Sequence, residues 1–162
     1  MGRGGALTDT PPRVTAVYAP PGRFRRTEQE RADEALSWAR PDQAFFAAGA
    51  CHILAWAFLR RHPTAGFRVV ALRAEQDAHA SHVYVAKGGW AFDHAGWTRE
   101  DELVAAITET EARNYERLHV DGDLASFCAD HNSRQPHQYV ELPWRRAEDY
   151  IVRLGGDEFP VR

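Results

Sequence analysis

The sequence has few cysteines and no long apolar run, and both shortages narrow the class of protein. Only two cysteines, Cys51 and Cys128, occur among 162 residues, too few for a disulfide framework. No apolar stretch approaches the roughly 20 residues of a membrane span. The opening stretch MGRGGALTDTPPR has no apolar run typical of a secretory signal. We therefore expect a cytoplasmic protein that does not enter a membrane, although export by a specialised secretion system would leave no such mark.

The sequence also lacks an excess of basic residues and a phosphate-binding loop. The 20 lysines and arginines face 23 acidic residues, and the resulting net charge of −3 indicates no nucleic-acid partner. The glycine pairs lack the strand–turn–helix context and the lysine of a phosphate-binding loop. We therefore expect neither nucleic acid nor a nucleotide cofactor among the ligands.

Metal ligands are present, but their spacing is not that of a structural zinc site. One set consists of Cys51, His52, His79, His82 and Asp93, and another of Cys128, His131 and His137. A metal centre is the rival chemistry for these residues. We predict no cofactor and no metal, and the oligomeric state stays open.

The order of local patterns predicts an α+β fold. Residues 1–22 are rich in glycine and proline and are expected to form an extended or partly disordered arm before a single domain over 23–162. Thr27 with Glu30 forms a capping-box pattern, and Thr98 is the expected cap of a later helix. Helices are predicted over 27–40, 50–61, 99–107, 122–131 and 143–156. Strands are predicted over 67–74, 82–87, 90–93 and 115–120, and the sheet is expected to be antiparallel.

Cys51 stands where a small-residue loop, "FAAGA", becomes an apolar helix. A thiol at a helix N-terminus, or beside an imidazolium, is stabilised as the nucleophilic thiolate. Small residues before it leave backbone N–H groups open to an oxyanion. The competing interpretation is a small buried hydrophobe, because free cysteine is among the most buried residue types.

The hairpin "HVYVAKGGWAFD" supplies a partner for Cys51. Gly88 and Gly89 suit a two-residue type I′ turn, which pairs Lys87 with Trp90 and extends the register to Tyr84 and Asp93. Side chains alternate along strands, so His82, Tyr84 and Asp93 share one face, with His82 a diagonal step from Asp93. If the helix of Cys51 packs on that face, the three residues form a Cys-His-Asp triad.

The stretches "GACHILAWAFL" and "HVYVAKGGWAFDHAGW" resemble small bacterial and phage members of the papain-like and transglutaminase-like superfamily of cysteine enzymes. The resemblance implies an antiparallel sheet packed on a central nucleophile helix, and chemistry through a thioester. It assigns Cys51 as nucleophile, His82 as base and Asp93 as the orienting acid. For the oxyanion hole and substrate binding, the further candidates are Gln43, His52, Tyr84 and Trp90.

The predicted function is that of a cysteine hydrolase, a protease, amidase or deamidase acting on a peptide, protein or small amide. Acyl transfer fits less well, because His82 and Asp93 are closer in sequence than in typical transglutaminases. The alternative is a binding module on the same fold, in which the aromatic stretch "GGWAFDHAGW" is a recognition surface. Cys128, followed by His131 and Asn132, is interpreted as a buried or idle thiol, because residues so crowded in sequence seldom reach triad geometry.

Overall fold

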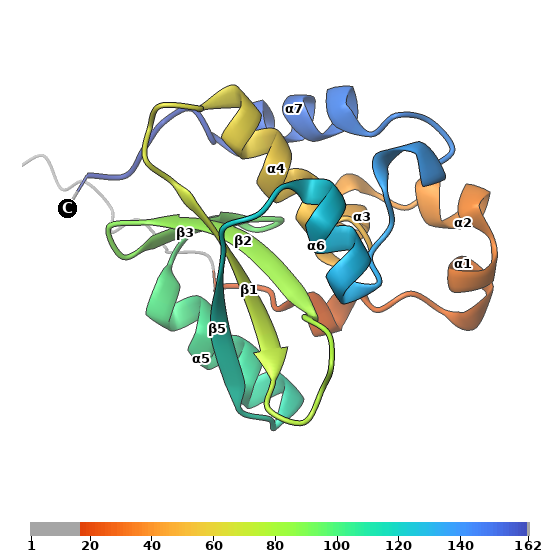
Figure 1. Ribbon diagram of the computed structural model, residues 1–162, viewed down its shortest axis with the longest axis horizontal. Helices are drawn as coiled ribbons and strands as arrows, with labels where there is room; N and C mark the ends of the chain where they lie inside the picture. Colours follow the sequence, from red (N-terminus) through yellow and green to blue (C-terminus); the bar gives the residue numbers. More distant parts are fainter. Residues whose placement is uncertain (1–16, 162) are drawn as a thin grey trace, which may run out of the picture.

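The computed structural model describes residues 17–161, and it shows a five-stranded antiparallel sheet with helices on both faces (Figure 1). The strands are β1 Arg68–Ala74, β2 His82–Lys87, β3 Trp90–Asp93, β4 Gly96–Arg99 and β5 Tyr115–Val120, in the order β4-β3-β2-β1-β5. The helices are α1 Glu28–Ala32, α2 Glu34–Trp38, α3 Asp42–Ala47, α4 Cys51–Arg61, α5 Glu100–Glu111, α6 Leu124–His131 and α7 Trp144–Arg153. Single 3-10 turns occur at η1 Pro21–Phe24 and η2 Pro136–Gln138. The predicted α+β class with an antiparallel sheet is confirmed.

The sheet separates two hydrophobic cores. On one face the apolar helix α4 lies along β2, with α7 beside it, and the core contains Ile53, Phe58, Val83, Val85 and Ile151. The opposite face is covered by α5, whose inner side contributes to a core of Val70, Leu72, Tyr84, Leu103 and Ile107 (Figure 1). Strand β2 thus has apolar neighbours on both faces, which is why it reads as a continuous apolar run.

The hairpin forms in the predicted register. Gly88 and Gly89 have φ of 59° and 82°, the left-handed region that a type I′ turn requires at both positions. Lys87 pairs with Trp90, and the pairing continues inward through Ala86–Ala91. The glycines therefore set which residues of β2 and β3 share a face.

Several local predictions need correction. The capping box of Thr27 and Glu30 is present, but the predicted helix over 27–40 breaks at Asp33. The Asp33 carboxylate accepts from the backbone of the next turn and starts a second helix, since an N-cap competes with helix continuation. Thr98 lies in β4 instead of capping α5, and neither β4 nor α3 was predicted, because both are too short to show a periodicity.

The predicted arm over residues 1–22 lies partly outside the described residues, and its described part is not extended into solvent. Residues 17–20 lead into η1, which begins at Pro21. Tyr18 donates a hydrogen bond to Asp93, and the carbonyl of Ala19 bonds to His94. These long-range contacts hold a segment whose composition alone indicated a loose arm. None of the described helices has the length and apolar character needed to cross a membrane.

The end of α7 is held by two glycines. Gly155 takes φ of 72°, and the Gly156 N–H donates to the carbonyl of Ile151 at 2.8 Å. This is the 6→1 bond of a Schellman motif. A Cβ at Gly156 would lie 2.4 Å from the Ile151 side chain and 3.1 Å from Phe92. Gly156 therefore allows the chain after α7 to pass directly against β3.

We expect Gly156→Ala to lower the free energy of unfolding by about 2 kcal/mol, because the added methyl overpacks the core at Ile151 and Phe92. Thermal and denaturant unfolding measure the loss. Gly122→Ala is the matched control, since the nearest atom to its Cβ would be 3.7 Å away. Equal stability of both variants would show that α7 shifts without cost.

Candidate active site

Cys51 is the first residue of α4, and the chain before it is built from small residues. Ala50 occupies the N-cap position and offers no side-chain cap, so the first-turn N–H groups are left without an intrahelical acceptor. Gly49 has φ of 108°, and its carbonyl accepts a 2.6 Å hydrogen bond from Tyr139. The Cys51 side chain is partly exposed at a pocket of about 270 Å³. The Cys51 thiol, with open N–H donors beside it, is thus partly accessible from solvent.

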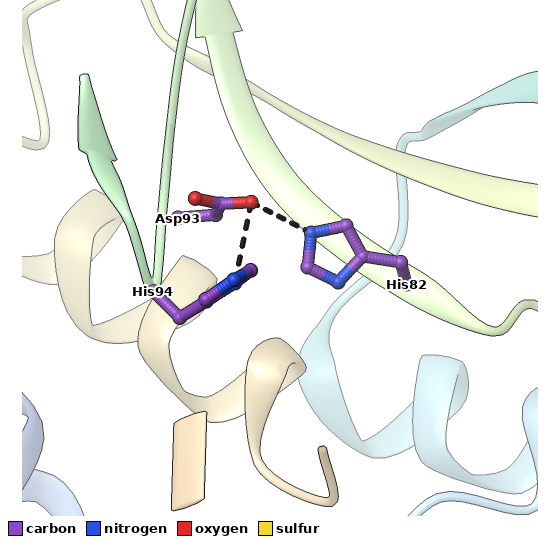
Figure 2. Close-up of side chains that lie close together, drawn as sticks. All are labelled: His82, Asp93 and His94. Carbon is purple, nitrogen blue, oxygen red and sulfur yellow. Dashed lines mark hydrogen bonds and ion pairs between the residues drawn. The ribbon is translucent and has the colours of Figure 1, made fainter. Parts of the chain in front are cut away.

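His82 and Asp93 meet at one end of the hairpin. His82 is the first residue of β2 and Asp93 the last of β3, and both side chains are buried. His82 Nε2 lies 2.8 Å from Asp93 Oδ2 (Figure 2). Since Nε2 donates to the carboxylate, the other ring nitrogen, Nδ1, is left for another partner. The hydrogen bond thus fixes both the orientation and the tautomer of the imidazole.

The Asp93 carboxylate is surrounded by donors. Oδ2 also accepts from the Tyr18 hydroxyl at 2.6 Å and faces His94 Nδ1 at 3.4 Å, the second contact drawn in Figure 2. Oδ1 accepts from the backbone N–H of Ala95 at 2.9 Å. Burial by itself raises the pKa of Asp93, but the charge of His94, the bonds from His82 and Tyr18 and the charge of His82 lower it to about 2. The carboxylate is therefore ionised at neutral pH.

The ion pair between Asp93 and His82 affects the pKa values of both His82 and Cys51. Burial disfavours the charged imidazole, but the bond to Asp93 and the neighbouring Cys51 raise the pKa of His82 to about 9. Burial raises the pKa of the Cys51 thiol, and the imidazoles of His52 and His82 outweigh it and lower this pKa to about 5. A free cysteine has a pKa near 8.5, so at pH 7 the arrangement favours a thiolate beside an imidazolium.

Cys51 reaches His82 at the end of the sheet and not across its face. Tyr84 and Ala91 belong to the core under α5, and by alternation His82 and Asp93 point to that face as well. The body of α4 packs on the opposite face, against Val83 and its neighbours. The condition that the helix packs on the His82 face is therefore not met. Contact arises because the helix N-terminus and the ends of β2 and β3 lie together.

His52, one of the predicted substrate-binding candidates, lines the same pocket as Cys51. Its Nε2 lies 2.7 Å from the carbonyl of Arg134, which accepts a hydrogen bond from it, and its ring stacks on Phe127. Burial lowers the pKa of His52, but interactions with Cys128 and Cys51 raise it to about 9. His52 is therefore a second cation beside the thiol, with no carboxylate to orient it.

The other predicted substrate-binding residues lie away from Cys51. Gln43 is exposed on α3 and lines a separate pocket together with Trp90, so the proposed oxyanion glutamine is not at the thiol. The Tyr84 hydroxyl donates to Glu100 at 2.9 Å on the α5 face. These residues were predicted from their nearness to Cys51 in the sequence or from the alternation of side chains along a strand. Neither pattern determines how far a side chain lies from Cys51 in the folded protein.

The structure brings together only part of the first candidate set of metal ligands. Within residues 17–161, ligand atoms close enough to share an ion belong to His82, Asp93 and His94, and Cys51 is not among them. His131 accepts from the backbone N–H of Ala80, and Cys128 is buried with its sulfur 3.4 Å from the carbonyl of Arg134. The structure does not bring Cys128, His131 and His137 together as one ligand set.

Sequence reasoning missed Tyr18 and His94 as partners of Asp93, and Arg26 and Arg134 as lining residues of the pocket. His94 follows Asp93 directly, which was a usable signal. Tyr18 lies 75 positions from Asp93, in a segment without a periodic pattern. No local signal marks such a contact.

We expect Tyr18→Phe to lower the free energy of unfolding by about 2 kcal/mol at pH 7, because it removes a hydrogen bond to a buried carboxylate. The pKa of Asp93 is below its unfolded value of about 3.9, so its contribution is present above that pH and is lost as the pH falls towards 2. The variant raises the pKa of Asp93, and acid unfolding should therefore begin at higher pH. Circular dichroism against pH measures it.

Tyr115→Phe is the control for this change, since in the described residues its hydroxyl makes no hydrogen bond to a carboxylate. An acid transition of Tyr18→Phe that coincides with those of the control and the original protein would mean that Tyr18 does not stabilise the ionised Asp93.

Comparison of this chain with protein-family models, curated protein sequences and solved structures finds no match in any of the three. The resemblance to papain-like and transglutaminase-like enzymes rests on the two motifs around Cys51 and His82.

Proposed function

We propose that the protein is a cysteine hydrolase that cleaves an amide or peptide bond through a thioester on Cys51, on a papain-like or transglutaminase-like core. The observation that carries the proposal is the chain of contacts from the thiol to His82 and from His82 Nε2 to the buried Asp93 carboxylate. A nucleophile, a base and a group that orients the base are the parts that nucleophilic acyl chemistry requires.

In the first half of the reaction, the Cys51 thiolate attacks the carbonyl carbon and a C–S bond forms. The carbonyl oxygen becomes an oxyanion near the N–H groups at the start of α4, where the helix dipole stabilises negative charge. The imidazolium of His82 then donates its Nδ1 proton to the leaving amine as the C–N bond breaks. The products are a free amine, a thioester and a neutral His82 still held by Asp93.

In the second half, neutral His82 removes a proton from a water molecule, whose oxygen attacks the thioester. The tetrahedral intermediate collapses with cleavage of the C–S bond and releases a carboxylic acid. The thiolate and the imidazolium are thereby restored. Throughout, Asp93 stays ionised and balances the charge that His82 carries.

The proposal predicts that Cys51 is alkylated at low pH. The rate constant for iodoacetamide, measured between pH 4 and 9 by mass spectrometry, should follow an apparent pKa of about 5, since alkylation requires the thiolate. Cys51→Ser gives the background from Cys128. A thiol that reacts only above about pH 8 would contradict the proposal.

Two histidine variants distinguish two explanations for the low pKa of Cys51: positive charge in general, or a specific triad with His82 and Asp93. His82→Gln removes the imidazolium that links Cys51 to Asp93 and should raise the apparent pKa of Cys51 towards that of a free thiol. His52→Gln removes one cation but leaves the His82–Asp93 pair, so a smaller rise is expected. Equal pKa values of Cys51 in both variants would contradict the role of His82 as the specific partner of the thiol. Circular dichroism checks that each variant is folded.

An acyl-enzyme should also be observable. With p-nitrophenyl acetate as the probe, we expect one acetyl group on Cys51, detected by mass after acid quenching and removed by hydroxylamine. His82→Gln should slow loss of the acetyl group at least tenfold, because water is no longer activated. Faster loss in the presence of added amines would indicate acyl transfer and not hydrolysis.

The alternative of a non-catalytic binding module has one structural feature in its favour. Trp90 and Trp97 line a pocket of about 610 Å³ together with Tyr18 and Gln43, away from Cys51. If Cys51 proves inert at neutral pH, this aromatic surface becomes the better candidate site. The two functions thus differ in the outcome of the same alkylation experiment.

A further inference from the structure

The pocket at Cys51 is lined by cations and by neutral polar groups. Its charged side chains are those of Arg26, Arg134 and, when protonated, His52, and among the described residues that line it none carries a carboxylate. Ser81, Asn132 and Ser133 complete the polar lining. The chemistry of this lining suits a negatively charged ligand.

Arg26 is the cation that lacks a partner. Arg134 forms an ion pair with Glu34 at 2.6 Å, whereas in residues 17–161 the guanidinium of Arg26 makes no ion pair and no side-chain hydrogen bond. Burial and the charge of Arg134 lower the pKa of Arg26. Glu30 interacts with Arg26 through its charge but forms its ion pair with Arg40. A half-buried guanidinium without a direct ion pair is energetically costly, and an anion from the substrate would relieve the cost.

Gly49 makes room for this guanidinium two residues before the thiol. A Cβ at Gly49 would lie 3.2 Å from Arg26 Cζ and 3.3 Å from Arg26 Nε, and the residue has φ of 108°. The side chain of Arg26 is thereby held against the backbone that leads into α4. Its charge is consequently placed beside the reacting centre.

The neighbouring pocket provides a contrast. It shares Gly49 and Ser81 with the pocket at Cys51, so the two adjoin, and it has a volume of about 260 Å³. Its arginines are already paired, Arg25 with Glu111 and Arg113 with Asp77. Of the two adjoining pockets, the one at Cys51 therefore holds the arginine without an ion pair.

Building on the proposed hydrolase function, we infer that the enzyme acts on an amide that bears a carboxylate close to the scissile carbonyl, and that Arg26 binds this carboxylate. An acidic peptide or an amino-acid amide with a free carboxylate has this chemistry. The planar guanidinium matches the two oxygens of a carboxylate, which gives position as well as charge. Arg26 is thus a specificity-determining residue and does not take part in proton transfer.

Two alkylating agents of similar size test the inference. Iodoacetate and iodoacetamide share a leaving group but differ in charge, so the ratio of their rate constants at Cys51 reports charge selection at pH 7. Arg26→Gln should lower the iodoacetate-to-iodoacetamide ratio about five- to tenfold, the effect of one charge at close range in a partly solvated pocket. Arg26→Lys should keep most of the ratio, since the charge remains.

Arg23→Gln is the matched control, because Arg23 is exposed, makes no ion pair within the described residues and does not line the pocket. It changes the net charge as Arg26→Gln does, and its ratio should equal that of the original protein. A ratio that falls equally in both variants would overturn the inference, since the selection would then come from net charge. If Cys51 reacts readily but Arg26→Gln leaves the ratio unchanged, the inference fails while the hydrolase proposal stands. A thiol inert at neutral pH defeats the hydrolase proposal itself.

Protection experiments identify the anion. Succinamate, which carries one carboxylate and one amide, should slow alkylation of Cys51 by iodoacetamide more than the neutral succinamide, and Arg26→Gln should remove the difference. Protection by inorganic phosphate without protection by succinamate would overturn the assignment of a carboxylate.

Discussion

The buried carboxylate of Asp93 is the constraint on which the site depends. A charge without access to water is tolerated only when donors compensate it, and here three separate parts of the chain supply them. Tyr18 comes from the segment before η1, His82 from β2, and Ala95 from the turn after β3. Because these donors come from distant positions, the segment at Tyr18 has to dock before the carboxylate is satisfied. The site is therefore complete only when the segment at Tyr18 is docked on the sheet.

The two parts of helix α4 have different roles. Its interior packs in the hydrophobic core, and its first turn positions Cys51. Its interior residues are buried against β2 and α7, which leaves the helix little freedom to move. The rigid body fixes the position of Cys51 at the N-terminus, where N–H groups lack intrahelical acceptors. The same packing explains why the small residues Gly49 and Ala50 precede the thiol: larger side chains would meet Arg26 or the core.

The thiol and the side chains around it share an excess of positive charge. Two imidazoles stabilise the Cys51 thiolate, and the nearby Arg26 adds a positive charge that forms no ion pair within the described residues. Such a field lowers the pKa of a thiol and attracts an anionic ligand by the same Coulomb interaction. Activation of the nucleophile and selection of an acidic substrate would therefore share one physical origin, whereas the paired arginines of the adjoining pocket contribute to neither.

The sequence by itself determined what depends on near neighbours. The turn at Gly88 and Gly89 set the register that joins His82 to Asp93, and the cap at Thr27 set the start of α1. Tertiary structure decided that α4 packs on the opposite face and meets His82 only at the sheet end, that Gln43 lies elsewhere, and that Tyr18 and Arg26 join the site. Turn geometry and capping act over a few residues and leave a local pattern. Contacts between distant segments depend on how whole elements bury their apolar surfaces, which no short stretch of sequence encodes.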